Sequence, residues 1–205
     1  DLHSFPTRRS SDLWQIEVKL SPTFVAKGVF GHGQYKYVSN PDYVQTVDNT
    51  EKVLESDRIY WDNFNISGTP MTVGNIGITY NSPRYWWISL SGNYFARSYI
   101  GMNPVLRTDR ARAELAPEYI KQEKFDPGFT LDASAGISYR IRYKYYLSAN
   151  LSVSNLLDNR TIKSGGYEQL RVNIDRDTNR MLRPFDSKYF YMFGRTFFLN
   201  VNFRF

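Results

Sequence analysis

Carboxylates are the side chains of this sequence that could most readily do chemistry, and they gather between residues 42 and 62. The six members of this group are Asp42, Asp48, Glu51, Glu55, Asp57 and Asp62. A calcium loop needs oxygen ligands at fixed spacing around a tight glycine turn. This stretch lacks that spacing, so we interpret it as the charged surface of a solvated loop and predict no metal site.

Nucleophiles and other metal ligands are scarce. The chain has no cysteine and two histidines, His3 in its N-terminal tail and His32. Thiolate catalysis and cysteine-type zinc sites are therefore excluded. Neither a histidine-based triad nor a multi-histidine metal site can be built around His32 alone. We expect no enzyme, no catalytic residue and no cofactor.

Composition narrows the function classes further. The 205 residues carry a net charge of +6, spread along the chain without a Lys/Arg-rich run, so we do not expect nucleic acid as a partner. Mean hydropathy is -0.50, and no run of about 18 apolar residues predicts a transmembrane helix. Aromatic residues reach 17%, which suits a β-rich fold or an interfacial aromatic girdle.

The elements that must position any site are strands, because apolar and polar residues alternate along most of the chain. The pattern predicts seven strands, over residues 14–20, 25–38, 72–80, 85–99, 129–142, 147–157 and 197–205. Near Gly74 the alternation slips, which predicts a bulge or kink. We therefore predict an all-β fold with an antiparallel sheet.

The predicted connections alternate strictly between short and long. Residues 21–23, 82–84 and 142–144 form short turns, whereas about 39–70, 100–128 and 159–187 form long segments. Outer-membrane barrels have short periplasmic turns and longer extracellular loops. The order therefore favours an antiparallel transmembrane β-barrel fragment, an open sheet of about seven strands whose edges lie near Trp14 and Phe205. The closing strands would lie upstream.

The long segments contain signals of local structure. Thr108 is a candidate N-cap for a helical stretch over 109–124, interrupted at Pro117. Asn49 is a candidate start for a short turn through residues 51–56. The sequence Asp-Thr-Asn at 177–179 predicts a hairpin turn, with Asp175 and Asp177 as surface charges.

One face of the predicted strands is polar. Its candidate lumen-facing residues are Asp132, Arg140, Asn150, Asn200, Asn202 and Arg204. Such residues fit a wet barrel interior, and they equally fit the solvent face of a one-sided sheet.

Aromatic residues lie near the predicted strand ends, in two groups. We place Trp14, Tyr85, Trp86, Tyr145 and Tyr146 near the short turns, and Tyr35, Tyr37, Tyr94, Tyr99, Tyr189 and Tyr191 toward the opposite end. Two belts separated by a strand's length are typical of interfacial girdles, although cross-strand packing could give part of the pattern.

The last predicted strand has an apolar residue at every second position, ending in an aromatic one. These residues are Phe197, Leu199, Val201, Phe203 and Phe205. The pattern resembles the C-terminal signal that the barrel-assembly machinery reads on outer-membrane proteins.

Further motifs resemble the C-terminal barrel of TonB-dependent receptors, most closely the Bacteroidetes type. In that family an Asn-Leu-Leu-Asp strand end precedes a Gly-Tyr-Glu loop, and a strand with Gly-Arg-Thr-Phe-Phe closes the barrel. The matching positions here are Asn155, Leu156, Leu157, Asp158, Gly166, Tyr167, Glu168, Gly194, Arg195 and Thr196. The segments PVLRTDRARAELAP and IKQEKFDPGFTLD also resemble the family's penultimate extracellular loop. The resemblance covers most of residues 14–205.

The resemblance implies energy-coupled uptake of a scarce nutrient through a 22-stranded type of barrel in the bacterial outer membrane. It implies as partners the membrane lipid, the barrel-assembly machinery, the TonB complex acting through an N-terminal plug region, and a small-molecule, glycan or peptide ligand. The plug and the TonB box are not in this sequence. Two other readings stay open: a passive porin-like or structural barrel, and a soluble β-sandwich binding module.

The start of the chain has a separate interpretation. Residues His3 to Leu13 match, residue for residue, the translation of a widely used short-read sequencing adapter. We interpret residues 1–13 as a non-native, adapter-derived tail and residues 14–205 as a C-terminal portion of a receptor barrel. The native protein would then begin further upstream.

Overall fold

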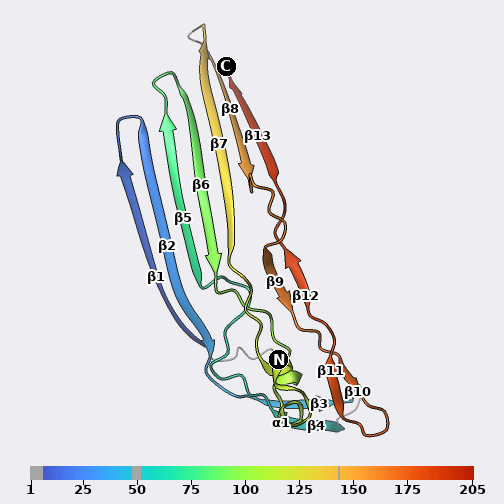
Figure 1. Ribbon diagram of the computed structural model, residues 1–205. Coiled ribbons are helices and arrows are strands. Elements are labelled where there is room, and N and C mark those ends of the chain that lie inside the picture. The colour runs from blue at the N-terminus through green and yellow to red at the C-terminus, as the bar shows by residue number, and fades with distance from the viewer. Residues whose placement is uncertain (1–6, 48–51, 143) are drawn as a thin grey trace.

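The computed structural model describes residues 7–47, 52–142 and 144–205. Within these, the chain forms one large antiparallel sheet and three small two-stranded sheets (Figure 1). The sheet has seven strands in the order β1-β2-β5-β6-β7-β8-β13, so the predicted all-β fold and open sheet are confirmed. Its strands are β1 (Thr7–Lys19), β2 (Phe24–Tyr37), β5 (Thr72–Asn81), β6 (Trp86–Ala96), β7 (Gly128–Ile141), β8 (Tyr145–Ser154) and β13 (Thr196–Arg204).

The edges of the sheet lie where the sequence predicts them. β1 and β13 each pair with one neighbour only, and no ladder joins them. The first strand begins at Thr7, earlier than the predicted start at Trp14, because the ladder with β2 continues from Trp14↔Phe30 to Thr7↔Tyr37. The predicted bulge near Gly74 is wrong, since Gly74 keeps its register with both Phe30 and Tyr94. Glycine removes an apolar side chain there without breaking the ladder.

The connections separate into two ends of the sheet. Tight turns join β1 to β2, β5 to β6 and β7 to β8 at one end, which we call the turn end (Figure 1). The three long segments lie at the opposite end. We call them together the loop cluster, comprising the described residues of 38–71, 97–127 and 155–195. The predicted order of short and long connections is confirmed.

The loop cluster has secondary structure of its own. It contains the hairpin of β3 (Asp42–Thr46) and β4 (Val53–Arg58), the hairpin of β10 (Val172–Ile174) and β11 (Met181–Pro184), the pair of β9 (Lys163–Tyr167) and β12 (Lys188–Tyr191), and the short helices η1 (Pro104–Arg107), α1 (Asp109–Glu114) and α2 (Pro117–Ile120). No helix of the described residues is long and apolar enough to cross a membrane.

Three local predictions fall within the loop cluster. Thr108 caps α1 as predicted, its hydroxyl accepting from the Ala111 N–H at 3.2 Å, and helix resumes at Pro117 but ends at Ile120. The hairpin turn at 177–179 is also confirmed, between β10 and β11. The turn predicted over 51–56 is wrong for its described part, because Val53 begins strand β4; its start, Asn49, lies outside the described residues.

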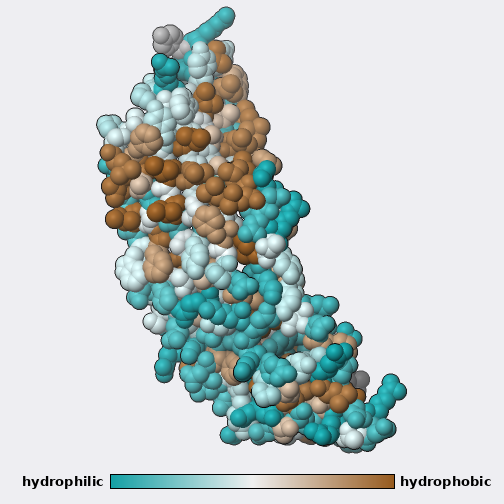
Figure 2. Space-filling model, in the orientation of Figure 1, coloured by the Kyte–Doolittle hydropathy of each residue, from teal (hydrophilic) through white to brown (hydrophobic). Residues whose placement is uncertain are grey.

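Register divides the sheet into two faces of opposite character. One row across all seven strands is entirely apolar, and it consists of Val18, Ala26, Ile78, Leu90, Ala133, Val153 and Phe197. The side chains on this side form the apolar face. The adjacent row includes Thr79, Ser89, Ser134 and Ser152 and points to the other side, the polar face. Figure 2 shows hydrophobic side chains gathered in a band over the sheet, with hydrophilic residues predominating over the loop cluster.

Hydrophobic burial lies outside the large sheet. In the part of the chain that the structure describes, every buried hydrophobic side chain belongs to the loop cluster: Ile59, Trp61, Met71, Ile100, Leu106, Ala111, Leu115, Phe125, Ile162 and Met181. On the apolar face Ile76 remains 73% exposed and Leu199 65% exposed. Among residues 7–47, 52–142 and 144–205, the sheet therefore packs no hydrophobic core.

The aromatic belts are partly as predicted. At the turn end Tyr80 packs between Phe24 and Trp86, with ring centroids 4.8 and 5.1 Å apart. Trp14 was assigned to this end, but it stacks on Phe30 at 5.5 Å, in the row of Tyr94 near the loop cluster. The prediction was wrong because β1 begins at Thr7, so Trp14 lies midway along the strand and not at its turn end.

Candidate functional site

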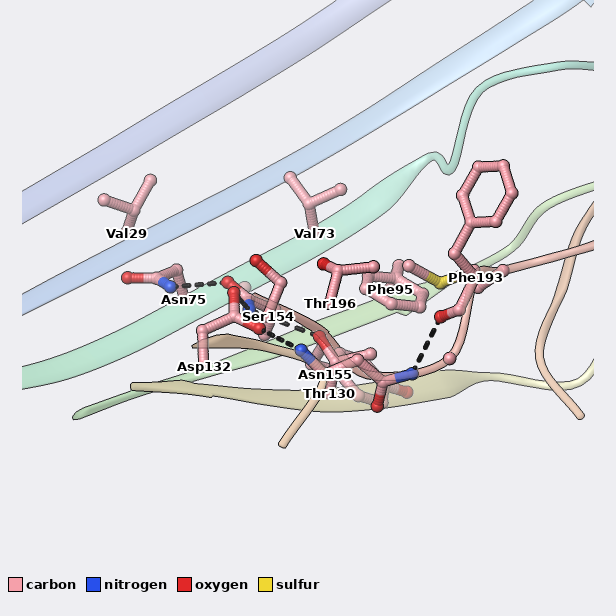
Figure 3. A pocket seen from close by; sticks show the side chains of 15 residues that line it. Val29, Val73, Asn75, Phe95, Thr130, Asp132, Ser154, Asn155, Phe193 and Thr196 are labelled. Atoms are coloured by element: carbon pink, nitrogen blue, oxygen red, sulfur yellow. Dashed lines mark hydrogen bonds between the residues drawn. The ribbon is translucent and has the colours of Figure 1, made fainter. Parts of the chain in front are cut away.

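A hollow of about 550 Å³ lies on the polar face, where the sheet meets the loop cluster (Figure 3). Its floor comes from β5, β6 and β7 and its rim from the ends of β8 and β13. The lining residues are Val29, Val73, Gly74, Asn75, Asn93, Tyr94, Phe95, Thr130, Asp132, Ser154, Asn155, Met192, Phe193, Gly194 and Thr196. Pockets of this size, mostly apolar with a few convergent polar groups, are typical of small-ligand sites. We therefore take this hollow as the candidate site.

A chain of hydrogen bonds crosses the floor of the hollow. The Asn75 amide donates to Asn93 Oδ1 at 2.7 Å, and the Asn93 amide donates to Asp132 Oδ2 at 2.8 Å and to Thr130 Oγ1 at 3.3 Å (Figure 3). The three residues Asn75, Asn93 and Asp132 can meet because β5, β6 and β7 are neighbours and each side chain points to the polar face. Asp132 is the one charged side chain in the lining. The site therefore combines one carboxylate with amide and hydroxyl side chains that can both donate and accept hydrogen bonds.

The Asn-Leu-Leu-Asp segment fixes the rim of the hollow. Asn155 has a positive φ of 50°, its N–H donates to Asp132 Oδ1 at 2.8 Å, and its side-chain amide donates to the Phe193 carbonyl at 3.0 Å. Asp158 accepts from the Arg195 N–H at 2.7 Å. Two hydrogen bonds lower the pKa of the Asp158 carboxyl. The larger effect comes from the Arg195 N–H and the smaller from the Arg160 guanidinium. The end of β8 thus holds the segment that leads into β13.

The Gly-Tyr-Glu segment connects two of the long loops. The Glu168 carboxylate takes a two-pronged ion pair from the Arg107 guanidinium, with one prong at 2.8 Å, and a further bond from the Asn103 N–H at 2.8 Å. The Arg107 side chain is fully buried and that of Glu168 is 10% exposed. Backbone bonds continue the contact, since Gly101 donates to the Gly166 carbonyl and Glu168 donates to the Gly101 carbonyl.

Helix α1 joins all three long segments. From its first turn Asp109 accepts from the Tyr60 hydroxyl at 3.0 Å. Near its end Glu114 accepts from the Met181 N–H at 2.6 Å. The N–H of Arg110 donates to Asp57 at 3.1 Å. Burial alone would raise the pKa of the Asp57 carboxyl, but hydrogen bonds from the N–H groups of Arg110 and Arg58 outweigh it and lower that pKa.

The predicted polar residues share one face but do not form one site. Asp132 lies in the hollow near the loop cluster, whereas Arg140 lies at the other end of the same strand. Asn150 and Asn200 are cross-strand neighbours midway along β8 and the edge strand β13, and Asn150 also pairs with Gly136 on β7. A Cβ at Gly136 would lie 2.4 Å from Trp87 Nε1, so only glycine leaves room for that indole. Asn202 and Arg204 follow toward the turn end.

Four residues of the C-terminal pattern, Phe197, Leu199, Val201 and Phe203, lie on the apolar side of the edge strand β13, and Phe205 follows the strand. Exposure ranges from 56% at Phe203 to 90% at Phe205. The pattern therefore places unpaired backbone and exposed apolar side chains on the same strand.

The acidic stretch predicted to be a solvated loop does not form a metal site among its described members. Asp42 pairs with Arg58 at 3.4 Å, and Asp57 caps backbone N–H groups. No cluster of three or more potential metal ligands occurs in residues 7–47, 52–142 and 144–205. Asp48 and Glu51 lie outside the described residues.

Sequence reasoning missed two parts of the site. Asp132 was a predicted candidate, but its partners Asn75 and Asn93 come from two other strands, and no local spacing links them to it. Arg107 and Glu168 are 61 positions apart, and each lies in a segment that resembles the receptor family. That resemblance was the available signal, although it assigns no partner to either residue.

Comparison with known proteins gives no further identification: no protein-family model matches the chain, and no significant match is found among curated proteins.

Proposed function

We propose that this chain is a C-terminal portion of an outer-membrane receptor that takes up a scarce nutrient through a β-barrel, with energy supplied through TonB. In this proposal the apolar face contacts lipid, the polar face lines a wet lumen, and the loop cluster faces the cell exterior. The chain does no covalent chemistry.

One observation carries the proposal: the apolar face spans all seven strands and remains exposed, while the buried side chains lie in the loop cluster. Soluble monomers rarely expose a large continuous apolar surface, because burying it is worth roughly 25 cal/mol per Å². A lipid bilayer covers such a face without a second protein layer. A soluble β-sandwich would need a second sheet packed against it.

The open edges support the same proposal. β1 and β13 each present an unpaired row of N–H and C=O groups. In hydrocarbon each unsatisfied group costs several kcal/mol, so a spanning sheet has to close on itself. We infer that further strands of the receptor pair with both edges and complete a barrel of the 22-stranded type.

Membrane insertion can be tested with cysteine pairs, because the chain has no native cysteine. Ile78→Cys and Thr79→Cys are neighbours on β5 that point to the apolar and polar faces, respectively. Each variant of the full chain is labelled with bimane in lipid vesicles, and brominated lipids serve as the quencher. We expect strong quenching at position 78 and weak quenching at position 79.

A second pair controls for local effects. Leu90→Cys and Ser89→Cys occupy the matching positions on β6, and they should repeat the contrast. Equal quenching on both faces, or a chain that stays in the aqueous fraction, would contradict a membrane barrel and favour the soluble module.

Energy coupling needs a separate experiment, because a passive pore would share the same sheet. The motifs at residues 155–158, 166–168 and 194–196 support the receptor, since their side chains hold the long segments together. Long-read sequencing of the source DNA across the codons of Leu13 and Trp14 should show a frame that continues into more strands, a plug domain and a TonB box. A frame with strands and no plug would instead indicate a passive barrel.

A further inference from the structure

A second hollow, of about 780 Å³, lies at the turn end of the polar face. A single cross-strand row, Arg140↔Tyr146↔Arg204, lies across it and joins β7, β8 and β13. The other lining residues are Ser138, Lys144, Leu147, Ser148, Asn202 and Phe205. This hollow lies at the opposite end of β7 from the one that contains Asp132.

An adjoining hollow of about 590 Å³ extends this surface toward the β5–β6 turn. It contributes Pro83, Arg84, Tyr85 and Tyr139, and it shares Ser138, Arg140 and Tyr146 with the first hollow. The two hollows adjoin at these three shared residues. We call them together the turn-end groove, which extends from the β5–β6 turn to β13.

The charge of the turn-end groove is of one sign. Four of its lining residues are cationic, Arg84, Arg140, Lys144 and Arg204, and none of the lining residues is Asp or Glu.

Aromatic rings lie beside the cations of the groove. The Arg140 guanidinium lies 5.1 Å from the centre of the Tyr146 ring, and the Lys144 ammonium lies 5.3 Å from that of Tyr145. Tyr85 and Tyr139 are 78% and 64% exposed. Arginine beside exposed tyrosine is the composition enriched in protein-binding surfaces.

We propose that the turn-end groove binds an extended acidic peptide segment of a partner protein. The groove is elongated and carries cations along its length, whereas a single phosphate would occupy one bidentate guanidinium. Serine and asparagine side chains and exposed tyrosine rings between the cations suit a peptide's backbone and side chains. The inference rests on the groove and does not depend on the proposed function, under which the partner would lie in the periplasm.

The test uses the full chain in micelles of a zwitterionic detergent. The probe is a fluorescein-labelled octapeptide that alternates Glu with Ser, and binding is followed by fluorescence anisotropy. We expect binding that weakens steeply between 0.05 and 0.5 M NaCl, because salt screens exposed charges. The octapeptide that alternates Lys with Ser should not bind.

A matched pair of variants localises the binding. Arg140→Gln with Arg204→Gln removes two charges from the groove, and we expect the dissociation constant to rise at least about tenfold. Arg176→Gln with Arg183→Gln removes two exposed charges from the β10–β11 hairpin and should change it less than about twofold. Circular dichroism checks that both variants keep the strand signal.

Several outcomes would overturn the inference. An equal loss of peptide affinity in the two double variants would mean that the net charge of the chain alone attracts the peptide. Displacement of the peptide by inorganic phosphate at millimolar concentration would indicate a small oxyanion site. If the chain bound phosphatidylglycerol vesicles but not the acidic peptide, and the groove variant lost that vesicle binding, the groove would bind lipid headgroups. Each result is independent of the bimane quenching at positions 78 and 79, so failure here leaves the membrane proposal standing.

Discussion

The large sheet and the loop cluster are built on opposite principles, although one chain makes both. The sheet is regular, continuous in register and nearly without buried hydrophobic side chains. The loop cluster has short, irregular elements, and yet it contains the hydrophobic core around Leu106, Ala111 and Leu115, with Met181 from a different segment. The regular backbone is therefore in the sheet, and the buried hydrophobic side chains are in the loop cluster.

The difference indicates which medium each region is adapted to. The loop cluster hides apolar side chains and pairs buried polar ones such as Arg107 and Asn103, as a small water-soluble domain does. The sheet pairs its interior backbone groups but leaves its apolar side chains outside. In the proposed barrel, lipid covers that face and contributes to its stability. Mutations should separate the two regions, because among the described residues only the loop cluster has a core that a truncation can damage.

The largest expected effect is at the buried ion pair. Glu168→Gln leaves the Arg107 guanidinium fully buried without its counter-charge, and we expect a loss of about 3–5 kcal/mol in local stability. Hydrogen exchange should accelerate around residues 100–108 and 163–168, while the sheet stays protected. Asp42→Asn is the matched control, because its pair with Arg58 is exposed and worth less than about 1 kcal/mol. A small loss of stability in Glu168→Gln would contradict a large contribution from the buried ion pair.

A pair of identical substitutions compares the two regions directly. Ile100 is fully buried in the loop cluster, and Ile76 is 73% exposed on the apolar face. Ile100→Ala should cost about 2–5 kcal/mol, because it leaves a cavity. Ile76→Ala should change stability by no more than about 0.5 kcal/mol, because no protein atoms close around it. Denaturant melts in detergent would measure both, and equal costs would mean that a protein layer covers the apolar face.

The sequence predicted the sheet far better than the loop cluster, for a physical reason. A strand repeats every two residues, so Leu131, Ala133 and Ala135 indicate their face without knowledge of any partner. The order of short and long connections then predicted which strands are neighbours in the sheet. The site depends on contacts such as Asn93 with Asp132 and Arg107 with Glu168, which join distant segments. Such contacts have no period, and the 51–56 segment shows that even a local signal fails where pairing with β3 decides the conformation.

A smaller effect is expected at the start of α1. The Thr108 hydroxyl accepts from the Ala111 N–H and donates to the Val105 carbonyl at 3.0 Å. Thr108→Ala should cost about 1 kcal/mol, the usual value of an N-cap. Because α1 joins all three long segments, exchange should accelerate in β4 and β11 together. Thr46→Ala, at an exposed position, is the control, and an effect confined to α1 would mean that the helix does not connect the segments.

The smallest expected effect is that of acid pH, which should weaken contacts in the loop cluster and leave the sheet intact. The folded state lowers the pKa of the Asp158 and Asp57 carboxyls. A lowered pKa contributes stability that is fully present above the unfolded value, about 3.9, and is lost as pH falls through the folded value. We therefore expect the contact between residues 155–158 and 193–195 to open below about pH 4, while strand dichroism persists. In Asp158→Asn the exchange of Arg195 should lose this pH dependence, because the group that titrates has been removed. A pH dependence unchanged in that variant would assign the opening to another carboxylate.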